Sequence, residues 1–138
     1  MTIAEKQNGI VSALCGLKTA QDRLGWIVRR GREHPALEEA LKTDAHRVEG
    51  CLAKVWFVPE FSEGRCHFKI DSDSAVVKGI AVVLCDIYSG QTPAEIVATS
   101  PAFLEQFGIT QHLTPNRRNS LAEIAKTIQA FAREKMNS

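Results

Sequence analysis

The sequence predicts an α+β fold: a small curved antiparallel sheet of about three strands, with helices before and after it. Apolar residues recur at helical spacing near the N-terminus, and two β-rich runs flank a turn in the middle of the chain. Helical blocks with capping residues follow to the C-terminus. Because no linker, repeat or low-complexity tract divides the chain, residues 1–138 are expected to form a single domain.

Two helices are expected before the sheet. The first starts at Thr2, which stands three residues before a glutamate in the pattern of a capping box. The second starts near Thr19, and Gly31 is expected to end it as a C-terminal stop. The mostly polar segment 29–47 predicts a loop that contains a short helix around residues 37–41.

The central part of the chain predicts an antiparallel hairpin. Residues 52–58 are rich in β-formers and are closed by Pro59, and residues 66–70 alternate between apolar and polar side chains. Residues 62–64 have the turn chemistry that connects two such runs. A shorter third strand is expected to end at Val48.

Helices are predicted for the rest of the chain. Residues 76–87 are apolar nearly all round, which is typical of a central buried helix, and Gly90 is expected to end it. Asp71 and Asp73 are interpreted as the turn and the cap that lead into this helix. Later helices are predicted from pairs of a capping residue and a proline, at Thr92–Pro93, Ser100–Pro101 and Thr114–Pro115.

The composition excludes several classes of protein. Seventeen Lys and Arg against sixteen Asp and Glu leave a formal charge of +1, which argues against a nucleic-acid-binding protein. The longest apolar run, residues 80–85, is far shorter than the about 18 residues of a transmembrane helix, so no membrane contact is expected. Residues 1–10 lack the apolar core of a signal peptide, which predicts a cytoplasmic protein.

Cys51 has the position expected of a reactive thiol. It follows Gly50 and directly precedes the first strand, on a predicted loop that a second macromolecule can reach. The cations Arg47 and Lys54 are near it in the sequence and would favour the nucleophilic thiolate. The alternative is an inert cysteine at the edge of a strand, and the pattern alone leaves both interpretations open.

The other three cysteines are interpreted as structural. Cys85 falls in the buried helix, Cys66 alternates with inward-facing residues, and Cys15 ends the apolar stripe of the first helix as a core or semi-exposed residue. The chain has no CxxC pair, so the sequence predicts neither a zinc ribbon nor a dithiol redox site.

The histidines offer two less favoured alternatives. Cys51, Cys66 and His67 would form a shared metal site only awkwardly, because adjacent strand residues face opposite sides of a sheet, and no metal site is predicted. Cys51 with His46 or His112 would resemble a nucleophile and its base, but no hydrolase signature accompanies the pair.

Four blocks of the chain together resemble the SufE family, the sulfur-acceptor proteins of iron–sulfur cluster assembly. Residues 48–56, Val-Glu-Gly-Cys-Leu-Ala-Lys-Val-Trp, are similar to the family's V-x-G-C-x-S-x-V-W. Residues 71–79, Asp-Ser-Asp-Ser-Ala-Val-Val-Lys-Gly, are similar to D-S-D-A-x-I-V-K-G. Residues 91–96, Gln-Thr-Pro-Ala-Glu-Ile, and 111–117, Gln-His-Leu-Thr-Pro-Asn-Arg, complete the match in family order. The resemblance covers roughly residues 48–121 and implies a SufE/IscU-like fold.

The resemblance implies a sulfur carrier that stimulates a partner enzyme and is not itself a stand-alone enzyme. A cysteine desulfurase, SufS- or CsdA-like, would hold sulfur as a persulfide on its own cysteine. Cys51 would accept that sulfur as Cys51–S–SH and pass it to an iron–sulfur scaffold complex of the SufBCD type. Pyridoxal phosphate (PLP) belongs to the desulfurase, so no cofactor of the chain's own is expected. A homodimer is one option. A loop that tucks Cys51 against apolar neighbours when idle, and extends on docking, would protect the persulfide.

Gly50, Asp73 and Arg117 are expected to support Cys51. Arg117 stands in the first turn of the last predicted helix, where a cation gains nothing from the helix dipole, and it would favour a thiolate or persulfide anion. With Arg118 it is otherwise interpreted as part of a solvated face. Asp73 would place the start of the central helix in the surface that docks the desulfurase.

One departure from the family pattern and two alternatives complete the expectations. Ala53 replaces the serine that commonly lies two residues after the cysteine, which removes a hydroxyl able to bond the active sulfur. An iron–sulfur scaffold protein is one alternative, although it needs several convergent thiolate ligands. A regulatory binding module for a desulfurase, without obligatory sulfur relay, is the other.

Overall fold

The computed structural model describes residues 1–99 and 113–137, and its elements follow the order that the sequence predicts. The helices are α1 (Ile3–Cys15), α2 (Ala20–Glu33), α3 (Ala75–Tyr88), α4 (Pro93–Ala98) and α6 (Pro115–Met136), with the 3-10 helices η1 (Glu39–Leu41) and η2 (Asp44–His46). The strands are β1 (Val55–Ser62) and β2 (Arg65–Ser72). The helix predicted from Ser100–Pro101 lies outside the described residues.

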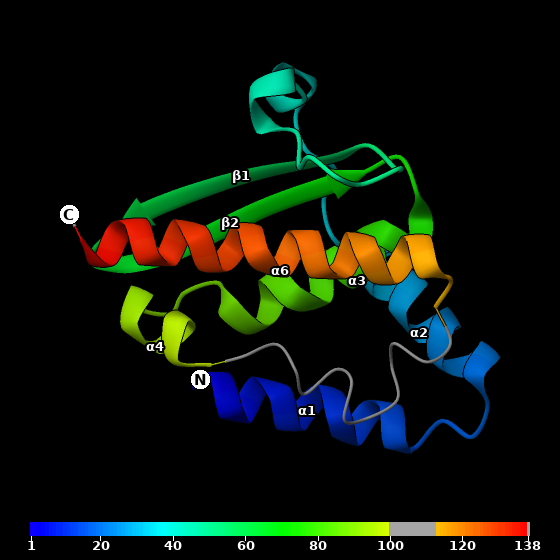
Figure 1. The fold of residues 1–138 in the computed structure, drawn as a ribbon. Helices are drawn as coiled ribbons and strands as arrows, with labels where there is room; N and C mark the ends of the chain where they lie inside the picture. Colours follow the sequence, from blue (N-terminus) through cyan, green and yellow to red (C-terminus); the bar gives the residue numbers. More distant parts are fainter. Residues whose placement is uncertain (100–112, 138) are drawn as a thin grey trace.

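The hairpin and the helices form layers (Figure 1). Helices α3 and α6 lie against one face of the hairpin, and α1 and α2 pack against α3 on the side away from it. Aromatic rings join the layers: the ring centroids of Phe57 and Phe68 are 5.3 Å apart, and Phe131 of α6 lies 5.9 Å from Phe68. Helices packed on a small antiparallel sheet confirm the predicted α+β class.

The hairpin has the predicted partners. β1 and β2 pair antiparallel from Val55 opposite Ser72 to Ser62 opposite Arg65, around a turn at residues 63–64. The expectation that Pro59 closes the first strand is wrong, because β1 continues to Ser62. A strand can contain proline where its missing N–H is not needed by a neighbouring strand.

The prediction of about three strands is wrong by one among the described residues. Before β1 the chain makes an isolated bridge between Arg47 and Trp56, in which the Val48 amide donates to the Val55 carbonyl at 2.9 Å. Pairing then stops, because Gly50 adopts a φ of +86° and turns the backbone away from the strand direction. The predicted third strand is therefore one bridge long.

Gly31 does not end α2, which continues to Glu33. It is buried where α2 crosses α3, and a Cβ atom at Gly31 would lie 2.8 Å from the backbone nitrogen of Gly79. The glycine therefore allows two helix backbones to approach closely, which is a packing role and not the stop that the sequence predicts.

The predicted helix starts are confirmed for most helices, with one correction. Thr2, Thr19, Thr92 and Thr114 each accept a hydrogen bond from the backbone amide three residues later. The cap of α3 is Ser74, whose side chain accepts from the Val77 amide, so Asp73 is not the cap. Within residues 1–99 and 113–137, no helix is both long and apolar enough to cross a membrane.

Candidate functional site

Cys51 lies on the short loop that connects the Arg47–Trp56 bridge to β1. It is half-buried and packs against the edge of the hydrophobic core, whereas its neighbour Leu52 is 78% exposed. Gly50 is needed at this point for two reasons: its φ is +86°, and a Cβ atom there would lie 3.2 Å from Cδ of Glu123. The sequence thus places the thiol at a tight turn of the backbone against helix α6.

Three residues near the start of α6 hold this end of the loop, and we call their interactions the α6 contacts. The Asn119 side-chain amide donates to the Gly50 carbonyl oxygen at 2.6 Å. The Ser120 hydroxyl lowers the pKa of the Cys51 thiol and the Glu123 charge raises it, and the Glu123 side chain also packs beside Gly50. All three residues belong to α6, and each acts on the loop through its side chain.

The other end of the loop is held by residues that follow β2, and we call this arrangement the Lys54 clamp. The Asp73 carboxylate accepts from the Lys54 amide at 2.9 Å, and the Asp73 amide donates to the Lys54 carbonyl at 3.2 Å. The Ser72 hydroxyl donates to the same carbonyl at 2.7 Å. Both backbone polar groups of Lys54 are therefore bonded, and Asp73 serves the Cys51 loop and not the helix start.

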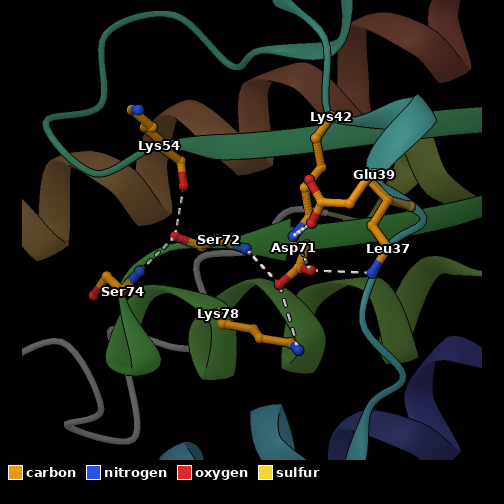
Figure 2. A network of polar contacts seen from close by, with 8 residues as sticks. All are labelled: Leu37, Glu39, Lys42, Lys54, Asp71, Ser72, Ser74 and Lys78. Carbon is orange, nitrogen blue, oxygen red and sulfur yellow. Dashed lines mark hydrogen bonds and ion pairs between the residues drawn. The ribbon is translucent and has the colours of Figure 1, made fainter.

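Asp71 anchors the clamp from beneath (Figure 2). It is 4% exposed, and its carboxylate accepts from the Ser72 amide at 2.8 Å and from the Leu37 amide at 3.0 Å. Nζ of Lys42 and Nζ of Lys78 lie 3.5 Å and 3.4 Å from its oxygens. Although burial favours the neutral acid, the amide hydrogen bonds and the Lys78 charge hold the pKa of Asp71 below its ordinary value.

The electrostatics at Cys51 differ from the expectation of a favoured thiolate. Burial is the largest effect and raises the pKa of the Cys51 thiol; the Ser120 hydrogen bond lowers it, the Glu123 charge raises it, and the Arg47 charge lowers it. The guanidinium of Arg47 lies 5.9 Å from the Trp56 ring centroid, which holds this cation near the loop. The net pKa shift is upward, so the resting thiol is mainly neutral at pH 7.

A hollow of about 260 Å³ opens beside the loop. Its walls come from the loop itself and from the first turns of α3 and α6, through Leu52, Ala53, Ser74, Val77, Thr114, Asn116, Arg117 and Ser120. Arg117 is half-buried in this lining, whereas Arg118 is exposed. The structure therefore brings all three predicted supporting residues into the surroundings of Cys51. Gly50 precedes it in the chain, Asp73 bonds Lys54 of the same loop, and Arg117 lines the hollow beside the loop.

The other cysteines have different surroundings. Cys66 and Cys85 are buried, and burial raises the pKa of both thiols. The prediction that they face the core is confirmed. Cys15 is exposed on α1, so its expected core or semi-exposed position is wrong. Among the four thiols, Cys51 alone combines partial exposure with a position on a loop between elements.

Among the residues that the structure describes, no geometry favours the alternatives based on histidine. His46 has its Nδ1 atom 2.8 Å from the Leu41 carbonyl oxygen, within its own segment. His112 lies outside the described residues. In the part of the chain that the structure describes, no group of three or more His, Cys, Asp or Glu side chains is placed to hold a metal ion.

Sequence reasoning missed the α6 contacts. Asn119, Ser120 and Glu123 stand beside the apolar stripe of the last helix, and nothing in their own pattern distinguishes them from its solvated face. One signal was available, because Ser120 and Glu123 are three residues apart and so lie on one side of a helix. Their common neighbour, the Cys51 loop, is about seventy residues earlier in the chain and required the tertiary structure.

Cys51, on a tight loop placed by a hairpin and the ends of two helices, is the candidate functional residue of the described part of the chain. The family model for the SufE Fe–S metabolism associated domain matches residues 8–132. The chain belongs to the SufE family, and through it to iron–sulfur metabolism.

Two curated relatives and one solved structure agree with this assignment. The chain is 37% identical, over 83% of its length and 70% of the relative's, to an uncharacterized SufE-like protein of Synechocystis sp.. It is 36% identical, over 74% of its length, to SufE-like protein 1, chloroplastic/mitochondrial, of Arabidopsis thaliana, and spans 28% of that longer protein. The solution structure of a hypothetical protein from Thermus thermophilus has the same fold, with a TM-score of 0.79 at 18% identity over 96% of this chain and 97% of that one.

Proposed function

We propose that this protein accepts persulfide sulfur from a cysteine desulfurase on Cys51, stimulates that enzyme, and passes the sulfur on for iron–sulfur cluster assembly. The observation that carries the proposal is the placement of the Cys51 thiol, half-buried on a glycine-led loop beside the exposed Leu52. Membership of the SufE family supports the same assignment.

The transfer is an exchange between sulfur atoms. The Cys51 thiolate attacks the terminal sulfur of the desulfurase persulfide, so a bond forms from Cys51 Sγ to that sulfur while the S–S bond of the donor breaks. The donor cysteine leaves as a thiolate, and the proton that Cys51 gave up returns to it or to solvent. The transferred sulfur keeps its oxidation state, so the step needs no oxidant or reductant. PLP, which frees sulfur from cysteine, belongs to the desulfurase.

The resting geometry suits a carrier that reacts on docking. A thiol whose pKa is raised by burial is a poor nucleophile at pH 7, which limits its reaction with oxidants in the absence of a partner. The exposed side chain of Leu52 offers apolar contact area next to the thiol. A desulfurase that bound Leu52 would draw the loop outward and bring Cys51 to its persulfide.

Arg117 and Asp73 have separate tasks in this proposal. Arg117 lines the hollow beside the loop, where its guanidinium would attract a thiolate or persulfide anion and acidic groups of the partner. Asp73 positions the loop through Lys54, and it is itself exposed, so its charge also belongs to the surface that docks the desulfurase. The SufBCD-type scaffold would receive the sulfur after the desulfurase leaves.

Desulfurase turnover tests the proposal. Wild-type protein should accelerate alanine formation from cysteine by a purified SufS-like desulfurase, and Cys51→Ser should lose that acceleration while still binding. Cys15→Ser is the matched control, because Cys15 is exposed on α1 and should be dispensable. Full acceleration by Cys51→Ser would contradict sulfur relay and would favour the regulatory binding module.

A further inference from the structure

The segment that carries η1 and η2 runs beside the hairpin and leads into the Cys51 loop (Figure 1). We call residues 37–46 the strap. Most of its residues are exposed, but Leu37 is buried and Lys42 is half-buried. Both of these residues contact Asp71, the buried carboxylate near the end of β2. The strap is therefore tied to the same residue that anchors the Lys54 clamp.

The two oxygens of the Asp71 carboxylate serve different segments of the chain (Figure 2). Oδ2 accepts from the Leu37 amide at 3.0 Å and lies 3.5 Å from Nζ of Lys42, so it faces the strap. Oδ1 accepts from the Ser72 amide at 2.8 Å. The Ser72 hydroxyl in turn donates to the Lys54 carbonyl at 2.7 Å. One carboxylate thus joins the strap to the end of the loop that enters β1.

Lys42 also contacts the framework at the start of the loop. Its Nζ atom lies 5.4 Å from the centroid of the Trp56 ring, where an ammonium is attracted by the negative face of the ring. The backbones of Trp56 and Arg47 form the isolated bridge at which the loop begins, and the Arg47 guanidinium lies 5.9 Å from the same ring. Lys42 therefore reaches one end of the loop through Asp71 and the other through Trp56.

The surroundings of Lys42 hold its ammonium in this place. Oε1 of Glu39, three residues earlier in the strap, lies 3.2 Å from Nζ. The hydrogen bond with Glu39 is the largest of the effects that raise the pKa of Lys42. The Lys42 side chain is 21% exposed and that of Asp71 is 6% exposed, so solvent screens their attraction less than it screens a surface ion pair.

We propose that Lys42 is a positioning residue for Cys51, which fixes both ends of the Cys51 loop from the strap. Removing its ammonium leaves the buried Asp71 carboxylate with one charged partner fewer and withdraws a cation from the Trp56 ring. Ser72 loses a fixed acceptor for its amide, and both ends of the loop loosen. That the fixed loop presents Cys51 to a persulfide rests on the proposed function, whereas the control of the loop by Lys42 does not.

Alkylation of Cys51 by iodoacetamide, followed by mass spectrometry of the Cys51 peptide, tests the proposal. No desulfurase is present, so a failure here is distinct from a failure of the proposed function. Lys42→Met keeps an unbranched side chain and removes the ammonium. Cys51 should then react about threefold faster at fixed pH, because a looser loop exposes the thiol more often and relieves the burial that raises its pKa. Lys42→Arg, which keeps the positive charge, should react at nearly the wild-type rate.

Arg30→Met is the control for a general loss of stability. It breaks the 2.6 Å ion pair between Arg30 of α2 and Asp86 in the last turn of α3. Because this ion pair joins neither the strap nor the Cys51 loop, its removal should leave the alkylation rate of Cys51 unchanged. An unchanged rate in Lys42→Met would overturn the proposal, and so would an equal acceleration in Arg30→Met.

A double variant tests the route from the strap to the loop. Ser72→Ala removes the hydroxyl that donates to the Lys54 carbonyl and should itself accelerate alkylation. Since part of the effect of Lys42 passes through Ser72, Lys42→Met should accelerate alkylation less in the Ser72→Ala protein than in the wild type. Equal acceleration in the two backgrounds would show that the residues act independently, which also overturns the proposal. Circular dichroism of each variant checks that the fold is retained.

Discussion

The two ends of the Cys51 loop are held in different ways. The Lys54 clamp bonds both backbone groups of one residue, and it rests on the buried carboxylate of Asp71. The α6 contacts are single side-chain interactions, and the hydrogen bond from Asn119 to Gly50 is exposed. The Lys54 end of the loop is therefore held by several hydrogen bonds to residues at and after the end of β2, whereas the Gly50 end is held by separate side chains of α6.

This difference shows how a fixed hinge and a releasable thiol can share one short loop. The Asn119 and Ser72 side chains and the Asp73 carboxylate all make exposed hydrogen bonds to the loop, and each such bond costs little to break, because water replaces the lost partner. At Lys54, however, three hydrogen bonds must break together, and Ser72 is tied by its own amide to the buried Asp71 carboxylate. Opening at Cys51 is thus expected to need less free energy than opening at Lys54. Cys51 can move outward while the strand that follows it stays in place.

The largest effect is expected at the anchor of the clamp. Asp71→Asn should lower the free energy of unfolding by about 3 kcal/mol, because it leaves a buried amide donor and two partly buried lysines without a carboxylate. Since the pKa of Asp71 is lowered in the folded state, its contribution is present above the unfolded pKa of about 3.9 and is lost as the pH falls through the lower folded pKa.

Urea unfolding between pH 7 and pH 3 measures this prediction. The difference in stability between wild type and Asp71→Asn should be full at pH 7 and should shrink below about pH 4. Asp44→Asn, at an exposed position, is the control and should differ little from wild type at either pH. A stability difference that does not change with pH would contradict the assigned role of the carboxylate.

A smaller effect on stability is expected at the α6 contacts. Asn119→Ala removes an exposed hydrogen bond and should cost less than about 1 kcal/mol of unfolding free energy. Because the Gly50 end of the loop is then free more often, Cys51 should be alkylated a few-fold faster at fixed pH. Asn8→Ala, exposed on α1, serves as the control. An alkylation rate equal to that of the control would show that Asn119 does not restrain the loop.

The smallest effect is expected from the charge of Glu123. This carboxylate raises the pKa of Cys51, so Glu123→Gln should lower that pKa and increase the thiolate fraction below pH 8. The alkylation rate should rise by about twofold, with the pH midpoint moved downward. Glu60→Gln, an exposed change of the same charge on β1, should leave the midpoint in place. An upward movement of the midpoint in Glu123→Gln would contradict the electrostatic assignment.

Local patterns in the sequence predicted the local features of this fold. The hairpin, the threonine caps and the loop position of Cys51 each depend on a few neighbouring residues, so the sequence was sufficient for them. Gly31 and Asp73 were misassigned because a glycine that ends a helix and one that allows a close crossing look alike in a sequence. The same holds for an aspartate that caps a helix and one that bonds a distant amide.

The surroundings of Cys51 depend on contacts between distant segments, and they could not be predicted in the same way. The sign of the pKa shift is the clearest example. The nearby cations Arg47 and Lys54 suggested a favoured thiolate, but burial by the rest of the fold outweighs them. Burial is a property of the whole structure, whereas the charges can be counted along the chain.

The location of transferred sulfur tests the central claim most directly. The protein is incubated with a cysteine desulfurase and cysteine, trapped with an alkylating reagent, digested, and analysed by mass spectrometry under non-reducing conditions. The account predicts a gain of about 32 Da, one sulfur atom, on the Cys51 peptide and on no peptide that carries Cys15, Cys66 or Cys85. Sulfur on another cysteine, or an undiminished gain in Cys51→Ser, would contradict the account.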